Sequence, residues 1–177
     1  MMKNKMMITL LAVGSALTAT HAFAAAGTVN FNGNILDSAC DVDVASQNQV
    51  VVLGDYYKTE FPTTGARTAA TQFNIVLKNC PVTVTNAKVR FDGTPDATNS
   101  SLLAIDSSAA GAATGVAINL MSADKADLPL HGSNSYSYVL SSTADNTLSF
   151  YAQYISTAAT VTAGPANSVA NFSVVYN

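Results

Sequence analysis

Residues 73–80, FNIVLKNC, decide the fold of this chain. Phe73, Ile75 and Leu77 fall on one face of an extended segment, and such a two-residue period is typical of a strand with one buried face. Similar runs recur along the chain, and Gly, Pro, Asn and Asp cluster between them as turns require. The recurring runs lie at residues 89–91, 116–120, 136–140 and 148–154. The pattern predicts an all-β protein, a two-sheet sandwich of seven or more short strands.

The N-terminus predicts a secretory signal peptide over residues 1–24. Lys3 and Lys5 precede an apolar stretch at residues 6–17, and Ala22-Phe23-Ala24 fits the small-x-small rule for cleavage. About a dozen apolar residues are too few to cross a membrane, which needs roughly 20. We therefore expect an exported chain of one domain that begins at residue 25, with Ser107–Thr114 as a loop inside that domain rather than a linker.

The charge of the expected mature chain argues against a nucleic-acid partner. All eleven acidic residues follow residue 24, whereas two of the eight basic residues precede it, which leaves a net charge of −5. The six remaining basic residues are scattered along the sequence, so no basic face is predicted.

Two cysteines, Cys40 and Cys80, lie in the expected mature chain. An even pair in an exported protein predicts a disulfide bond. With 39 residues between the cysteines, the chain-entropy model gives about 4 kcal/mol of stabilisation. Two thiols and a single mature histidine, His131, make a poor zinc site, so we expect no metal.

Two other groups of polar residues are candidates for reactive sites. Asp37, Asp41 and Asp43 form the densest carboxylate cluster, with Asp41 and Asp43 expected on one strand face, but they lack the glycine turn and bidentate Glu of a calcium loop. His131 has serine neighbours too near for a usual triad, and the chain holds no Gly-x-Ser-x-Gly motif. We therefore expect no catalytic residues, no cofactor and no enzymatic activity.

Both ends of the mature chain carry apolar alternation. Gly27, Val29, Phe31, Gly33 and Ile35 share one strand face, and four apolar residues alternate at the C-terminus. Termini are usually frayed and polar, so these two strands need partners. On periodicity alone, the strands either complete the chain's own sandwich or pair with another chain. The C-terminal apolar residues are Ala170, Phe172, Val174 and Tyr176.

Five segments lie in order along the mature chain, followed by Gly164 and the penultimate Tyr176. They are GTVNFNG at 27–33, DSAC at 37–40, QVVVLG at 49–54, FNIVLKNC at 73–80 and AGAATGVAI at 110–118. In these segments and their order the sequence resembles the pilins of chaperone–usher fimbriae, and among them the major subunits of type 1 and long polar fimbriae. The likeness covers the whole mature chain.

The resemblance implies an incomplete immunoglobulin-like sandwich that a donor strand from a neighbouring subunit completes. Residues 25–36 would be the donor extension and residues 37–177 the pilin domain. The donor strand would use Gly27, Val29, Phe31 and Gly33. The acceptor edge, which the family's chaperone also binds, would include Gly164, Ala170, Phe172, Val174 and Tyr176.

The resemblance also implies the partners and the place of the protein. These partners are copies of the chain in a homopolymer, a periplasmic chaperone, an outer-membrane usher and other fimbrial subunits. The expected function is that of a structural rod subunit, exported through the periplasm to a cell-surface fimbria used in adhesion. The alternative is a minor, adaptor or tip pilin with a receptor-binding role.

Overall fold

A computed structural model describes residues 27–33, 35, 39–132 and 134–176. The chain divides into two compact units, Met1–Ile35 and Leu36–Asn177, each described here by itself. The predicted signal peptide and its cleavage site lie outside the described residues. Within the described part of the chain, no helix is long and apolar enough to span a membrane.

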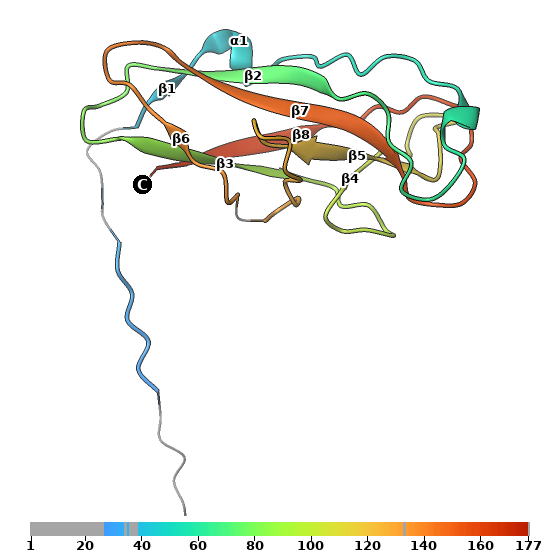
Figure 1. The fold of residues 1–177 in the computed structure, drawn as a ribbon, viewed down its shortest axis with the longest axis horizontal. Coiled ribbons are helices and arrows are strands. Elements are labelled where there is room, and N and C mark those ends of the chain that lie inside the picture. Colours follow the sequence, from blue (N-terminus) through green and yellow to red (C-terminus); the bar gives the residue numbers. More distant parts are fainter. Residues whose placement is uncertain (1–26, 34, 36–38, 133, 177) are drawn as a thin grey trace, which may run out of the picture. The chain divides into compact units, whose positions relative to one another are not determined.

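The second unit contains eight strands and two short helices among its described residues. They form a five-stranded sheet of order β1-β2-β7-β5-β4 and a three-stranded sheet of order β6-β3-β8, stacked as two layers (Figure 1). Every strand pair is antiparallel. The elements are β1 Asp41–Val42, α1 Val44–Gln47, the 3₁₀ helix η1 Lys58–Glu60, β2 Thr71–Lys78, β3 Asn86–Gly93, β4 Leu103–Ala104, β5 Val116–Met121, β6 Tyr138–Val139, β7 Asn146–Ser156 and β8 Ala170–Tyr176.

The larger sheet is built around β7, which pairs with β2 on one side and β5 on the other. Ile75 and Leu77 of β2 are fully buried, and Phe150 of β7 lies opposite Phe73. The two-residue period seen in residues 73–80 therefore marks the core face of this sheet, as predicted. The all-β prediction is confirmed.

The smaller sheet supplies the opposite wall of the core. Phe91 of β3 meets Phe150 edge-on, with 5.2 Å between ring centroids. Tyr138 of β6 is buried, and its hydroxyl donates a hydrogen bond of 2.7 Å to the backbone oxygen of Ser149. The strand predicted over residues 136–140 is shorter than expected, because Tyr136 precedes β6 and only two residues of the run pair with β3.

The predicted disulfide bond is present. Cys40 and Cys80 are bonded and buried, with their Cα atoms 4.2 Å apart. Cys40 directly precedes β1, and Cys80 lies two residues after the end of β2. The bond therefore closes one end of the larger sheet.

A bidentate ion pair joins two loops on the surface of the second unit. Arg67 donates hydrogen bonds of 3.1 and 3.0 Å to the two carboxylate oxygens of Asp127. Asn119 of β5 donates a third, of 2.7 Å, to the same carboxylate. The hydrogen bond from Arg67 is the main cause that lowers the pKa of Asp127 below its ordinary value. The pair thus connects the segment before β2 to the loop after β5.

We expect Arg67→Gln to raise the pKa of Asp127 towards its ordinary value. A depressed folded-state pKa stabilises the fold above the unfolded value, and this contribution disappears as the pH falls through the folded pKa. Both side chains are partly exposed, so the loss at neutral pH should stay below about 1 kcal/mol. NMR titration of Asp127 and urea unfolding across the acidic range measure both effects. Arg67→Lys keeps the charge and loses the bidentate geometry, so its Asp127 pKa and its stability should lie between those of wild type and Arg67→Gln. A loss of stability that does not depend on pH would contradict the assignment of the Asp127 pKa shift to this ion pair.

Candidate functional site

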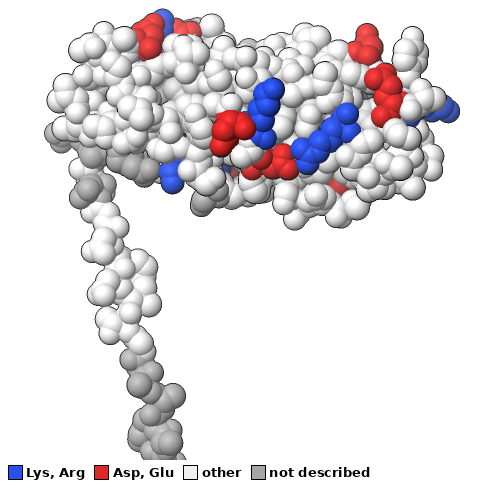
Figure 2. Space-filling model, in the orientation of Figure 1, with Lys and Arg blue, Asp and Glu red and all other residues white. Residues whose placement is uncertain are grey.

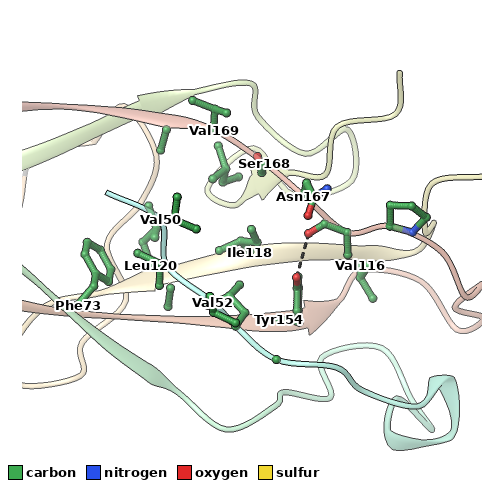
Figure 3. Close-up of a pocket in the computed structure, with 18 of the residues that line it drawn as sticks. Val50, Val52, Phe73, Val116, Ile118, Leu120, Tyr154, Asn167, Ser168 and Val169 are labelled. Atoms are coloured by element: carbon green, nitrogen blue, oxygen red, sulfur yellow. Dashed lines mark hydrogen bonds between the residues drawn. The ribbon is translucent and has the colours of Figure 1, made fainter. Parts of the chain in front are cut away.

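An open apolar groove of about 970 Å³ runs between the two layers of the second unit. Its floor comes from β2, β5 and β7, and its walls come from residues 46–56 on one side and residues 161–172 on the other. Figure 3 shows Ile118 and Leu120 of β5 on the floor, with Val50 and Val169 on opposite walls.

The floor of the groove is made of core side chains. Ile75, Ile118, Leu120 and Ala152 line it and are each less than a tenth exposed. Tyr154 also lines it, and its hydroxyl donates a hydrogen bond of 2.9 Å to the backbone oxygen of Ala166, drawn in Figure 3. This bond ties the wall of residues 161–172 to β7, and burial raises the pKa of Tyr154.

The strand β8 borders the groove with an edge that carries no strand partner. It lies at the end of the smaller sheet, and among the described residues its backbone pairs only with β3. Its inward side chains are half-buried against the core, whereas Asn171 and Ser173 are exposed. The inward side chains are the predicted set Ala170, Phe172, Val174 and Tyr176. The smaller sheet therefore ends where one further strand would cover the groove.

The opposite wall was not predicted as a structural element. Residues 49–56 form no strand, and no backbone–backbone hydrogen bond of theirs is found within the described chain. Gln49 fixes the segment to β2 by donating from Nε2 to the backbone oxygen of Asn74 at 3.2 Å. Val50 and Val52 are 88% and 76% exposed. This wall therefore offers a second free backbone edge, together with apolar side chains.

Gly164, predicted on the acceptor edge, lies in the wall before β8 rather than on the strand itself. A Cβ at this position would come within 1.9 Å of the backbone oxygen of Gly111 and 2.8 Å of the backbone nitrogen of Ala113. Ala113 in turn donates a backbone hydrogen bond of 2.9 Å to Pro165. Glycine is thus required because two backbones approach closely.

We expect Gly164→Ala to destabilise the domain by about 1–3 kcal/mol, the usual cost of overpacking. The methyl group must push the wall of residues 161–172 away from residues 111–113, since the clash is with backbone atoms. Ala163→Ser is a matched control at the exposed neighbouring position and should stay within about 0.5 kcal/mol of wild type. Urea unfolding measures both variants, and equal stability of the two would contradict the close approach.

The predicted donor residues lie in the first unit. Residues 27–33 and 35 have no regular secondary structure, and Val29 and Phe31 are 73% and 93% exposed. No Cβ contact would arise within 4 Å at Gly27 or Gly33. The prediction that these residues form a donor strand stays a prediction.

The charged and reactive side chains lie outside this groove, apart from Asp55 and Lys58 among the described lining residues. Asp43 caps α1 by accepting from the Ala45 nitrogen at 2.9 Å and pairs with Lys78 at 2.7 Å. It therefore does not share a strand with Asp41, contrary to the expectation, because the chain turns into α1 after Val42. On the face in Figure 2, Lys and Arg lie beside Asp and Glu on a mostly uncharged surface.

The remaining candidate, His131, has a structural position. Its Nδ1 lies 2.7 Å from Asp92 Oδ1 and its Nε2 lies 2.9 Å from the backbone oxygen of Gly93. The hydrogen bond from His131, followed by that from Arg90, lowers the pKa of Asp92. The ring thus fastens a loop to the end of β3. Within the described ranges, no group of three or more His, Cys, Asp or Glu residues could hold a metal ion.

Together, the two layers and the uncovered groove define an incomplete immunoglobulin-like β-sandwich. Comparison with known proteins agrees. A model of the family described as "Fimbrial protein" matches residues 29–177. The type-1 fimbrial protein A chain of Escherichia coli K12 is 38% identical, over 99% of this chain and 100% of that protein. The probable major fimbrial subunit LpfA of Escherichia coli O157:H7 is 41% identical, over 91% of each chain.

This chain is also similar to a solved chaperone–usher pilus structure, whose description refers to rod uncoiling. The two share 27% sequence identity, with a TM-score of 0.65. The match covers 90% of this chain and all of that one. This chain belongs to the fimbrial protein family. It is therefore a structural subunit of a surface-displayed fimbria, from a family that is not known to be enzymatic.

Proposed function

We propose that the groove receives the N-terminal segment of a neighbouring copy, and that this donor-strand exchange builds the fimbrial rod. The observation that carries the proposal is an apolar groove that ends at the unpaired edge of β8. The occupant must be an extended strand, since only a strand can pair with that backbone edge and also place alternate side chains on the floor. Strand addition by pilins is itself a standard example of this kind of recognition.

The segment at residues 25–36 has the chemistry that the groove requires. Val29 and Phe31 lie on one face of the segment with Gly27 and Gly33, and none of these residues is charged. Both walls present free backbone edges, β8 on one side and residues 49–56 on the other. An inserted strand could therefore form hydrogen bonds on both sides while its large side chains reach the apolar floor. The two glycines allow close approach at their positions.

Transient partners follow from the same geometry. An open apolar groove beside an unpaired strand edge promotes aggregation, so the subunit needs cover before assembly. A periplasmic chaperone that adds its own strand would supply this cover, and an outer-membrane usher would exchange it for the next subunit. The likeness to a chaperone–usher pilus supports this route. The polymer partners are copies of this chain and other fimbrial subunits.

A photo-crosslink from residue 31 tests the proposal. We would replace Phe31 with p-benzoylphenylalanine in the full-length subunit, assemble fibres, irradiate them and map the crosslinked peptides. The expected products join residue 31 of one subunit to residues 46–56 or 161–172 of another, since these ranges wall the groove.

The matched control places the same photo-reactive residue at Ser173, which is exposed on β8 and points away from the core. This probe should not crosslink to residues 46–56. Crosslinks from residue 31 that stay within one subunit would show that the strand completes its own domain. Crosslinks only to surfaces outside the groove would refute insertion.

A further inference from the structure

The chain contains one Asn-Gly pair, Asn32-Gly33, and it lies inside the proposed donor segment. Both residues are exposed, and residues 27–33 adopt no regular secondary structure. A Cβ added at Gly33 would meet nothing within 4 Å, so no other part of the chain crowds this residue on its Cβ side. An exposed Asn followed by Gly is the arrangement in which an asparagine side chain is most readily attacked by its own backbone.

We propose that Asn32 is a spontaneous deamidation site that is open before assembly and closed once the strand is inserted in a neighbour. The closure rests on the proposed donor-strand function. The backbone nitrogen of Gly33 attacks Cγ of Asn32, the bond from Cγ to Nδ2 breaks, and ammonia leaves with the proton from the Gly33 N–H. Water then opens the cyclic imide at either carbonyl, giving aspartate or isoaspartate.

The backbone determines when this reaction can occur. Gly33 has no Cβ to block the approach of its nitrogen, and glycine permits a wide range of backbone angles. A strand held in a sheet has an extended backbone that carries the Gly33 nitrogen away from Cγ, and its hydrogen bonds resist rotation. Insertion should therefore stop the reaction without any contact to the Asn32 side chain.

Other positions in the second unit lack one of these features. Asn99 precedes Ser100, and its Oδ1 already accepts a hydrogen bond of 3.1 Å from the Ser101 nitrogen. Asn134 precedes Ser135, is buried, and accepts from the Tyr136 nitrogen at 2.7 Å. Asn99 is exposed and is therefore the suitable internal reference.

The two products differ in their effect on assembly. Asn32 lies on the strand face opposite Val29 and Phe31, so an aspartate there leaves the inserted face unchanged. Isoaspartate instead adds a methylene to the main chain, which shifts Gly33 and Ile35 relative to Phe31. Register in a paired strand tolerates no such shift where one face is buried. Aged, unassembled subunits should thus lose the ability to polymerise through the isoaspartate product.

The experiment compares chaperone-bound full-length subunit with fibres, both aged in mildly alkaline buffer. Peptide mapping by mass spectrometry follows aspartate and isoaspartate at residues 32 and 99. We expect conversion at Asn32 of the subunit to be several-fold faster than at Asn99, and conversion in fibres to fall to the Asn99 level. Assembly yield of aged subunit should fall in proportion to its isoaspartate content.

Two variants separate the chemistry from the assembly. Asn32→Gln keeps the amide but needs a larger ring, so it should not convert and should assemble equally well fresh or aged. Asn32→Asp should assemble like fresh wild type. Absence of conversion at Asn32 in the subunit, or equal ageing losses in Asn32→Gln, would overturn the proposal. Equal conversion in subunit and fibre would overturn the closure, and the crosslink from residue 31 then reports separately whether the strand is inserted.

Discussion

Phe31→Asp is expected to abolish fibre formation while leaving the yield of chaperone-bound subunit unchanged. The core of the second unit is formed by side chains between Cys40 and Tyr176, so folding of that domain has its own apolar contacts. Insertion of the variant strand would instead bury a carboxylate against an apolar floor that offers it no partner. Such burial costs on the order of several kcal/mol. The measurement is complex yield and fibre yield for each variant.

The same segment supplies its own controls. Val29→Asp lies on the inserted face and should behave like Phe31→Asp. Asn30→Asp adds the same charge on the opposite face, so fibres should form at near wild-type yield. Parallel loss of complexes and fibres in Phe31→Asp would mean that the strand completes its own domain. Equal loss in Asn30→Asp would assign the effect to net charge rather than to burial.

Much of the β-sandwich could be predicted because apolar residues alternate with other residues within the sequences of several strands. Phe73, Ile75 and Leu77 alternate, and the structure places all three against the core. The C-terminal run was equally informative, since β8 spans Ala170–Tyr176 with its apolar residues inward. Local alternation works for β2 and β8 because one face of each of these strands packs against the core and the other is more exposed.

The groove could be predicted less completely. Its wall at residues 46–56 pairs with no strand among the described residues, so the apolar run at residues 50–53 does not show from its own sequence that it borders a groove. The need for glycine at Gly164 arises from the backbone of Gly111, far away in sequence. Tyr136 alternates with Tyr138 but falls outside β6, because only two residues there pair with β3. Contacts between distant segments decided these three cases, and periodicity does not encode such contacts.

Removal of the disulfide is expected to be the most damaging change within the domain itself. Replacing Cys40 and Cys80 with Ser frees a loop of 39 intervening residues, which the chain-entropy model values at about 4 kcal/mol. Since small domains are stable by only about 5–15 kcal/mol, this is a large fraction. The bond also supports the acceptor strand, because the Tyr176 hydroxyl lies 3.4 Å from the backbone oxygen of Cys40. We therefore expect the end of β8 to loosen as well.

Urea unfolding of the chaperone-free subunit, oxidised and reduced, provides the test. With a slope of about 2 kcal/mol per M, the loss should lower the unfolding midpoint by about 2 M. Reduced wild type should unfold at the midpoint of the double Ser variant, because both lack only the crosslink. Asn146→Ala is the matched control: its side-chain nitrogen lies 3.3 Å from the Cys80 sulfur, so it perturbs the same buried site with the bond intact. If reduction left the wild-type midpoint unchanged, while Asn146→Ala lowered it as far as the double variant, the stability would come from packing around the cysteines and not from the covalent link.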